Sequence, residues 1–215
     1  MFTGIIEAVG ILKTIEKKGV SGKINIDAAI DLASVSLGDS IAVSGACLTV
    51  VGITKTGFYA DISEETLNLT TLGRIPSGGF VNIERALTLS KPLGGHLVTG
   101  HIDGTGVIAK VARKDAYIDI TVSCPQGLME QVVKKGSVAV DGISLTVADI
   151  QTDSFTVAVI PHTVAMTTLK TASAGTKVNI ETDIIGKYVQ RFLAKGERQG
   201  ITEGFLSEHG FVKRG

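Results

Sequence analysis

Short stretches in which apolar and polar residues alternate, separated by turns rich in glycine, occupy most of the chain. A period of two is typical of strands that bury one face and expose the other. In the first half of the chain, the pattern predicts strands near residues 2–14, 22–30, 40–54, 57–62 and 80–87, with a weaker strand between them. In the second half, it predicts strands near residues 98–112, 116–123, 137–151, 154–160 and 177–184. Short strands at this spacing indicate closed or nearly closed antiparallel barrels.

Helical segments are short until the end of the chain. Between the strands, we expect helical turns at residues 32–35, 64–69, 128–133 and 164–169. After the last strand, apolar residues follow a helical spacing at Ile184, Ile185, Tyr188, Val189, Phe192 and Leu193. This helix either packs on its own barrel or joins copies of the chain, and the pattern favours neither interpretation. The polar, glycine-rich tail from Gly196 is expected to be loosely ordered.

The second half of the chain repeats the first. Residues 40–50 reappear as residues 137–147 with seven of eleven positions identical, at an offset of 97. Thr3-Gly4 reappears as Thr99-Gly100 at an offset of 96. A nearly constant offset over ordered segments indicates an internal duplication. We therefore predict an all-β protein of two tandem six-stranded antiparallel barrels and a C-terminal helix, with domains at residues 1–96, 97–185 and 186–206.

The composition limits the classes of function. Lys and Arg together balance Asp and Glu at 21 each, which argues against nucleic acid or an anionic membrane as the main partner. No apolar stretch reaches the roughly 20 residues that cross a bilayer, and the first residues do not resemble a signal peptide, so we expect a cytoplasmic protein. Cys47 and Cys124 are then expected to be free thiols. Neither has a partner at metal-ligand spacing, so no metal site is predicted.

The two copies differ at polar positions that a binding site could use. Three residues of the first copy and their counterparts in the second are Ser44 and Asp141, Cys47 and Ser144, and Glu65 and His162. Copies that diverge within a shared frame can bind two related molecules in unequal ways.

Ser144 and Thr146 are expected to share one face of a strand, because successive strand side chains alternate. Asp141-Gly142 would bend or bulge that strand and aim the carboxylate at a pocket. Alternatively, Asp141 and Ser144 only cap and satisfy a turn, and the residues alone favour this second interpretation. The linker at residues 94–106 carries two of the four histidines, and its glycines let a backbone come close to a ligand. Cys47 by itself is more typical of a small apolar residue than of a nucleophile.

Eight segments of the chain together resemble the riboflavin synthase α-chain family. They are residues 1–7, 47–50, 65–67, 82–85, 94–104, 141–147, 160–163 and 186–193. The resemblance covers the chain from residue 1 to about residue 195. One departure is Ser44-Gly45, where the family commonly has Asn-Gly, so a role for that amide does not carry over.

The resemblance implies two six-stranded Greek-key barrels and a C-terminal helix, assembled as a homotrimer. It implies a transferase reaction between two molecules of 6,7-dimethyl-8-ribityllumazine, which gives riboflavin and 5-amino-6-ribitylamino-2,4-pyrimidinedione without cofactor or metal. A four-carbon unit moves from donor to acceptor: the acceptor loses a proton from its C7 methyl group, and a nucleophile adds at C7 of the donor. The site is expected between the first barrel of one subunit and the second barrel of its neighbour. A lumazine synthase is a candidate further partner.

Carried over residue by residue, the resemblance assigns catalytic roles to Ser144, Asp141, Cys47, His101, Thr146 and Ser40. Asp141 would orient or activate Ser144, and His101 would assist proton transfer. The implied lumazine-binding residues grouped with the first barrel are Gly4, Ile5, Ile6, Cys47, Leu48, Thr49, Asp61, Ile62, Ser63, Glu64, Glu65, Thr66, Gly100, His101 and Ile102. Those of the second barrel are Lys135, Ser144, Leu145, Thr146, Ile160, Pro161, His162, Thr163, Val164 and Ala165.

Two other classes of protein have barrels of this kind. Lumazine proteins bind the chromophore as optical antennae without converting it, and they lose parts of the catalytic set that this chain retains. A flavin-dependent reductase would need a nicotinamide-binding α/β domain, which the pattern does not predict.

Overall fold

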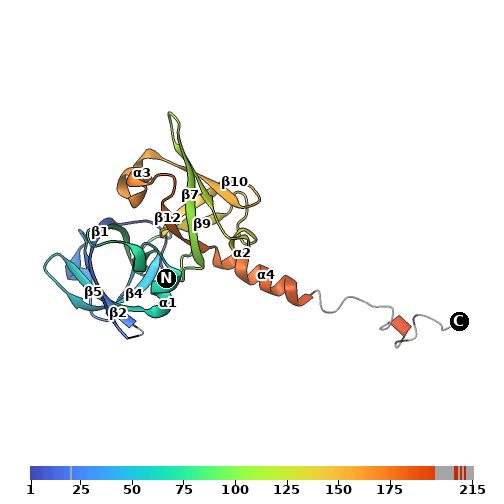
Figure 1. Ribbon diagram of the computed structural model, residues 1–215. Coiled ribbons are helices and arrows are strands. Elements are labelled where there is room, and N and C mark those ends of the chain that lie inside the picture. Colours follow the sequence, from blue (N-terminus) through green and yellow to red (C-terminus); the bar gives the residue numbers. More distant parts are fainter. Residues whose placement is uncertain (20, 197–205, 208, 210, 212–215) are drawn as a thin grey trace. The chain divides into compact units, whose positions relative to one another are not determined.

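The computed structural model describes residues 1–19, 21–196, 206–207, 209 and 211. Residues 1–184 form one compact unit, and the chain from Ile185 onward forms another. Within the described residues, the first unit consists of two closed antiparallel barrels of six strands each (Figure 1). The predicted fold class, two tandem barrels followed by a helix, is confirmed.

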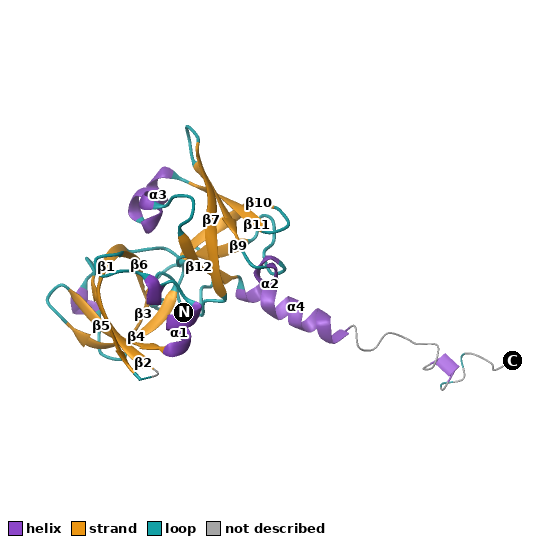
Figure 2. Ribbon diagram, in the orientation of Figure 1, coloured by secondary structure: helices purple, strands orange, loops and turns teal. Residues whose placement is uncertain are grey.

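Each barrel combines its strands with short helical segments (Figure 2). The first barrel contains β1 (Ala8–Lys18), β2 (Ser21–Asp27), η1 (Leu32–Ser34), β3 (Ser40–Val43), β4 (Ala46–Ile53), β5 (Gly57–Ser63), α1 (Glu64–Leu69), η2 (Leu72–Arg74) and β6 (Phe80–Arg85). The second contains β7 (Gly104–Arg113), β8 (Ile118–Ser123), α2 (Gln126–Met129), β9 (Ser137–Val140), β10 (Ile143–Ile150), β11 (Ser154–Val159), α3 (Pro161–Met166), η3 (Thr168–Thr171) and β12 (Lys177–Thr182).

Both barrels have the same Greek-key order. The strands of the first barrel follow the order β1-β2-β5-β4-β3-β6, and those of the second follow β7-β8-β11-β10-β9-β12. Register shifts also fall at matching positions, between Val50 and Gly52 in β4 and between Val147 and Asp149 in β10. The duplication therefore extends to the irregularities of single strands.

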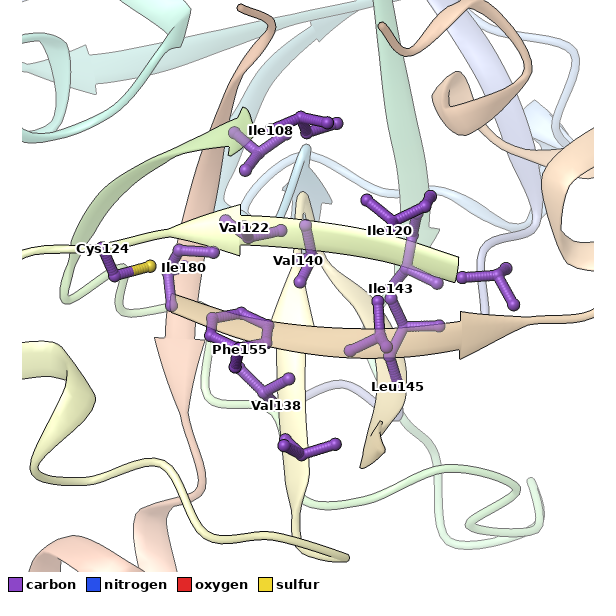
Figure 3. Packing of buried hydrophobic residues seen from close by; sticks show 14 of the residues in the cluster. Ile108, Ile120, Val122, Cys124, Val138, Val140, Ile143, Leu145, Phe155 and Ile180 are labelled. Carbon is purple, nitrogen blue, oxygen red and sulfur yellow. The ribbon is translucent and has the colours of Figure 1, made fainter. Parts of the chain in front are cut away.

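Apolar side chains fill the interior of each barrel. Figure 3 shows such side chains from β7, β8, β9, β10, β11 and β12 meeting inside the second barrel. Cys124 belongs to this cluster, and burial raises the pKa of its thiol to about 11, which makes the thiol unreactive. Because the interiors are packed, an organic ligand has to bind on the outside of a barrel.

The predicted strands at residues 40–54 and 137–151 each prove to be a tight hairpin of two strands. Ser44 and Gly45 form the turn between β3 and β4, with φ of 43° and 84°. Asp141 and Gly142 form the matching turn between β9 and β10, with φ of 46° and 78°. Positive φ at both central residues is typical of a type I′ turn. These hairpins supply the sixth strand of each barrel. Small and apolar residues on both sides of the turns conceal the break in the alternation.

Two segments that were predicted to begin strands lie outside the barrel sheets. β1 begins at Ala8 rather than residue 2, and β7 begins at Gly104 rather than residue 98. Phe2 and Val98 pair with each other instead: Phe2 N donates to Val98 O at 2.7 Å, and Val98 N donates to Phe2 O at 3.1 Å. Both side chains are buried in a small cluster with Ala42 and Ala139. This bridge ties together the segments that precede the two barrels.

Helix α4 (Ile184–Gly196) carries the predicted apolar stripe. Several of its apolar side chains are exposed: Ile185, Tyr188, Val189, Phe192 and Leu193. The tail that we expected to be loosely ordered falls almost entirely outside the described residues. Among the described residues, no helix is long and apolar enough to span a membrane.

Candidate active site

A cavity of about 200 Å³ lies on the outer face of the first barrel. Its lining comes from β4, from α1 and from the segment before β7: Ala46, Cys47, Glu65, Thr66, Leu69, Thr70, Gly100, His101 and Ile102. Cys47 points outward because its neighbours in β4, Ala46 and Leu48, are buried on the inner face. Ser63 fixes the start of α1, because its Oγ accepts a hydrogen bond from Thr66 N at 3.0 Å.

Gly100 lets the segment before β7 approach this cavity. Cys47 N donates to Gly100 O at 2.9 Å, and Gly100 has a φ of 86°. A Cβ at Gly100 would lie 2.5 Å from Cβ of Cys47. Glycine is therefore required here both for its backbone conformation and for the close contact.

The second barrel presents the matching groups at the matching place. Ser144 in β10 corresponds to Cys47 in β4, and α3 corresponds to α1. Gly4 corresponds to Gly100: Ser144 N donates to Gly4 O at 2.8 Å, and Gly4 has a φ of 74°. A Cβ at Gly4 would lie 2.6 Å from Cβ of Ser144.

Each site is thus completed by a segment that the sequence assigns to the other copy. Ile102 is buried in the core of the first barrel, and Ile6 packs against the core of the second. The sequence grouped Gly4, Ile5 and Ile6 with the first barrel, but the contact between Gly4 and Ser144 assigns this segment to the second. The segments cross between the barrels where Phe2 and Val98 pair.

His96 is the partner of Ser144. Its Nδ1 lies 2.7 Å from Oγ of Ser144, and its Nε2 is buried without a hydrogen-bond partner among the described residues. Burial lowers the pKa of His96, while the charge of Asp183 opposes that shift. The imidazole is therefore neutral at neutral pH and can accept a proton from the hydroxyl group of Ser144.

His96 is a candidate site residue that the sequence-based assignment missed. The comparison of the copies found Ser144 through its counterpart Cys47. His96 lies in the linker between the barrels, which occurs once in the chain, so it has no counterpart to be compared with. The glycine-rich linker with its two histidines was the available signal.

Asp141 lies at the seam between the barrels, and its side chain is hydrogen-bonded to Asn179 and not to Ser144. Its carboxylate accepts a hydrogen bond from Asn179 N at 2.8 Å, and its carbonyl accepts one from Asn82 Nδ2 at 2.9 Å. In the reciprocal contact, Asn179 Nδ2 donates to Ser44 O at 2.8 Å. Burial raises the pKa of Asp141 to about 7. The position of Asp141 in a turn, the second of the two interpretations, agrees with these contacts.

Ser40 does not line the cavity of Cys47. It lines a separate cavity of about 340 Å³ together with Glu7, Arg85 and Lys91. Both cations of that cavity pair with the carboxylate of Glu7.

The remaining predicted residues divide by the direction of their side chains. Four of them point into the barrel cores and can reach a ligand only through their main chain: Leu48, Ile62, Leu145 and Val164. Thr146 is exposed on the same face as Ser144, as predicted. Lys135 is exposed and has a φ of 68°, which is rare for a residue other than glycine.

The two sites differ in charge. The exposed residues Asp61, Glu64 and Glu65 stand beside the first site, where the second barrel has Ala158, Pro161 and His162. At the segment that completes each site, His101 on the first barrel corresponds to Ile5 on the second. The two sites thus have equivalent strands and helices but different polar side chains, as the sequence predicted. Among the described residues, no group of three or more His, Cys, Asp or Glu side chains is placed to hold a metal ion.

Known proteins share this arrangement of two domains. The family model of the lumazine binding domain matches the chain twice, over residues 3–86 and 99–183. The solved structure of LumP complexed with 6,7-dimethyl-8-(1'-D-ribityl) lumazine has a TM-score of 0.75 at 27% identity, and LumP complexed with riboflavin has a TM-score of 0.76 at 29% identity. Both comparisons cover 85% of this chain and 99% of the other. The fold and the two sites therefore define a protein of the lumazine-binding class.

Relatives that match nearly the whole chain narrow this class further. Riboflavin synthase of Bacillus amyloliquefaciens is 45% identical over 217 residues, covering 98% of this chain and 100% of the relative. Riboflavin synthase of Mycobacterium bovis is 43% identical over 197 residues, covering 90% of this chain and 98% of the relative. The chain belongs to the riboflavin synthase family, and the resemblance seen in the sequence is confirmed.

Proposed function

We propose that each barrel holds one molecule of 6,7-dimethyl-8-ribityllumazine during the riboflavin synthase reaction of this chain. One lumazine donates a four-carbon unit to the other, which gives riboflavin and 5-amino-6-ribitylamino-2,4-pyrimidinedione. The observation that carries the proposal is the pair of equivalent outer-face sites, one at Cys47 and one at Ser144, with different polar groups around them. Two like molecules with unlike roles require such a pair.

The contact between Ser144 and His96 supplies proton transfer at the second barrel. As the oxygen of Ser144, or a water molecule beside it, adds to the electrophilic C7 of a lumazine, Nδ1 of His96 takes up the proton that this oxygen loses. The neutral state of His96 suits this role, because a protonated imidazole has no free lone pair.

At the first barrel, His101 lies in the cavity beside Cys47. We assign to His101 the removal of the proton from the C7 methyl group of the acceptor lumazine, which leaves an anion spread into the ring system. Cys47 contacts the bound lumazine in this cavity. Every group in this scheme is a side chain, a water molecule or a substrate atom, so the proposed transferase is independent of cofactors.

A homotrimer in the cytoplasm completes the proposal. The exposed apolar side chains of α4 support a role in joining subunits, because a helix that carries Tyr188, Phe192 and Leu193 in water gains from covering them. In the assembly, the lumazine on the first barrel of one subunit meets the lumazine on the second barrel of its neighbour.

The decisive experiment is incubation of the purified protein with the lumazine alone, in the presence of a metal chelator. Riboflavin should appear in the absorbance spectrum, with one molecule formed for every two lumazine molecules consumed. Tight binding without conversion would instead support the antenna alternative. Conversion that stops in the chelator would contradict the cofactor-independent scheme.

A further inference from the structure

Two buried glutamates hold the segments that complete the sites. Glu84, in the last strand of the first barrel, is 1% exposed, and its carboxylate accepts three hydrogen bonds. Thr3 N and Thr3 Oγ1 donate to Oε1 at 2.7 Å and 2.6 Å, and Gly4 N donates to Oε2 at 2.9 Å. Both oxygens are thus occupied by one short segment.

Glu181 repeats this contact in the second barrel. It lies in the last strand of that barrel and is also 1% exposed. Thr99 N and Thr99 Oγ1 donate to its Oε1 at 2.6 Å and 2.7 Å, and Gly100 N donates to its Oε2 at 3.0 Å. Both barrels therefore hold the segment in front of them through the same three hydrogen bonds.

The segment that each glutamate holds serves the opposite barrel. Glu84 belongs to the first barrel, but Gly4 accepts from Ser144 N in the second barrel at 2.8 Å. Glu181 belongs to the second barrel, but Gly100 accepts from Cys47 N in the first barrel at 2.9 Å. Gly4 is therefore held by Glu84 of the first barrel and by the strand of Ser144 in the second barrel. Gly100 is held by Glu181 of the second barrel and by the strand of Cys47 in the first barrel.

The contact fixes the segment through charge-assisted hydrogen bonds and not through apolar packing alone. A buried carboxylate loses its hydration, and apolar packing can hold a segment without that cost. A carboxylate with two oxygens fixes two successive peptide N–H groups and a hydroxyl group at defined directions. That precision matters where the same peptide unit lines a binding site.

We propose that Glu84 is a positioning residue of the second-barrel site and that Glu181 is a positioning residue of the first-barrel site. The inference rests on the proposed function, since it takes both sites to bind ligand. Loss of the carboxylate at Glu84 releases Gly4 and Ile5 from their place against Ser144, while the cavity of Cys47 keeps its lining. Loss of the carboxylate at Glu181 has the reverse effect.

The test reads each site separately through a thiol. Cys47 lines the first site, and Cys124 is buried, so alkylation by iodoacetamide reports Cys47. The double substitution Cys47→Ser with Ser144→Cys moves the reporter thiol to the second site. Riboflavin is the probe, and the measured quantity is its concentration at half-maximal protection of the thiol. Each reporter protein is compared with the same protein carrying Glu84→Gln or Glu181→Gln.

A crossed pattern is expected. Glu181→Gln should raise the protecting concentration at Cys47 by about tenfold, because the segment of Gly100 loses one charge-assisted hydrogen bond. Glu84→Gln should leave that concentration within about twofold of the parent, because Glu84 holds the segment of Gly4 instead. With the thiol at position 144, the two substitutions should exchange their effects. An effect confined to the barrel that carries the glutamate, an equal effect on both sites, or no effect at all would overturn the assignment.

Milder variants guard against loss of folding. Thr3→Val and Thr99→Val remove one hydroxyl donor and should give the same crossed pattern at smaller size, whereas Thr3→Ser and Thr99→Ser keep the hydroxyl and should resemble the parent. Thermal unfolding of every variant separates loss of fold from loss of position. If riboflavin protects neither reporter thiol in the parent proteins, the proposed function fails, and this assignment fails with it. A failure of the crossed pattern alone leaves the proposed function intact.

Discussion

At Ser144, a hydroxyl group and a neutral imidazole meet at 2.7 Å on the outer face of a barrel. We expect Ser144→Ala and His96→Gln each to lower kcat by roughly 10²–10⁴-fold, the usual contribution of a positioned acid–base group. Binding of lumazine should weaken by no more than about tenfold, because one neutral hydrogen bond contributes only about 0.5–1.5 kcal/mol. Steady-state kinetics beside a fluorescence titration give both quantities.

The matched control is Cys47→Ser, which changes the equivalent position of the first copy. It should be milder, because a hydroxyl group replaces much of the hydrogen bonding of a thiol. Near wild-type kcat in both Ser144→Ala and His96→Gln would show that their contact serves only the fold.

Asp141 should make stability depend on pH. Burial raises its pKa from an ordinary value of 3.8 to about 7, so the folded protein favours the protonated form. Its contribution is fully present below about pH 4 and is lost as pH rises toward about pH 7, at up to about 1.4 kcal/mol per pH unit. Asp141→Asn keeps an acceptor for Asn179 N, tolerates a positive φ and does not titrate. Urea unfolding from pH 5 to pH 8 should show the variant gaining stability over the parent as pH rises.

Thr152→Asn, at an exposed position without a titratable group, serves as the control, and its stability difference from the parent should stay nearly constant with pH. Parallel curves for the parent and Asp141→Asn would contradict the shifted pKa.

Lys135 is held in a backbone conformation that costs free energy. Its N donates to Val147 O at 2.8 Å with a φ of 68°, and the first copy has Gly38 at the same place, donating to Val50 O at 2.8 Å with a φ of 91°. Lys135→Gly should stabilise the fold by roughly 0.5–1 kcal/mol, because glycine adopts this backbone conformation without strain. The substitution should also weaken lumazine binding, because it removes a side chain that the resemblance assigns to the ligand. Thermal unfolding and a lumazine titration measure the two effects. A destabilised variant with unchanged affinity would contradict both expectations.

Comparison of the copies located the frame of the site but not its contacts. Cys47, Ser144, Glu65 and His162 were found because a duplicated position exposes every polar difference. That comparison did not find His96, the partner of Ser144, because His96 has no counterpart in the other copy. The comparison did not find the contacts of Asp141 either. Asp141 lies in a turn that contacts the opposite barrel, and sequence spacing carries no information about that packing.

Among the elements, α4 differs from the strands in having its apolar side chains exposed. Truncation at Gly186 should yield a species smaller than a trimer in light scattering, with little activity left, because the stripe then no longer joins subunits. Phe192→Glu should act in the same direction without shortening the chain, and Arg191→Ala is the control on the same helix. A truncated protein that remains trimeric would contradict the role of α4.

The strands and short helices were predictable to different degrees. The alternation gave most strands and the helix α1, because those elements depend on local pattern. It missed the hairpin turns at Ser44 and Asp141, where the inward positions change from odd to even numbers in the first copy and from even to odd numbers in the second. It also extended β1 and β7 too far, because Phe2 and Val98 have strand-like residues around them but pair with each other.

For the whole molecule, the crossed segments make each barrel incomplete alone. The first barrel without residues 100–102 lacks part of the lining of its own cavity. A fragment of residues 1–95 still carries Thr3 and Gly4, the counterparts of Thr99 and Gly100. We expect two such fragments to exchange these segments and form a dimer, which sedimentation analysis can measure. A fragment of residues 1–95 that stays monomeric and binds riboflavin as tightly as the full chain would contradict this.

The exchanged segments also give the duplication a consequence for symmetry. A dimer of identical single barrels has a twofold axis, so its two sites are copies and any substitution enters both at once. A single chain with two copies lifts that constraint and still has paired contacts between its barrels, those of Asn82 and Asn179. Different histidines can then stand beside the two equivalent positions, His96 beside Ser144 and His101 beside Cys47. Under the proposed function, the fused chain can therefore hold the donor and the acceptor lumazine in unlike sites, whereas two identical barrels would hold them in like sites.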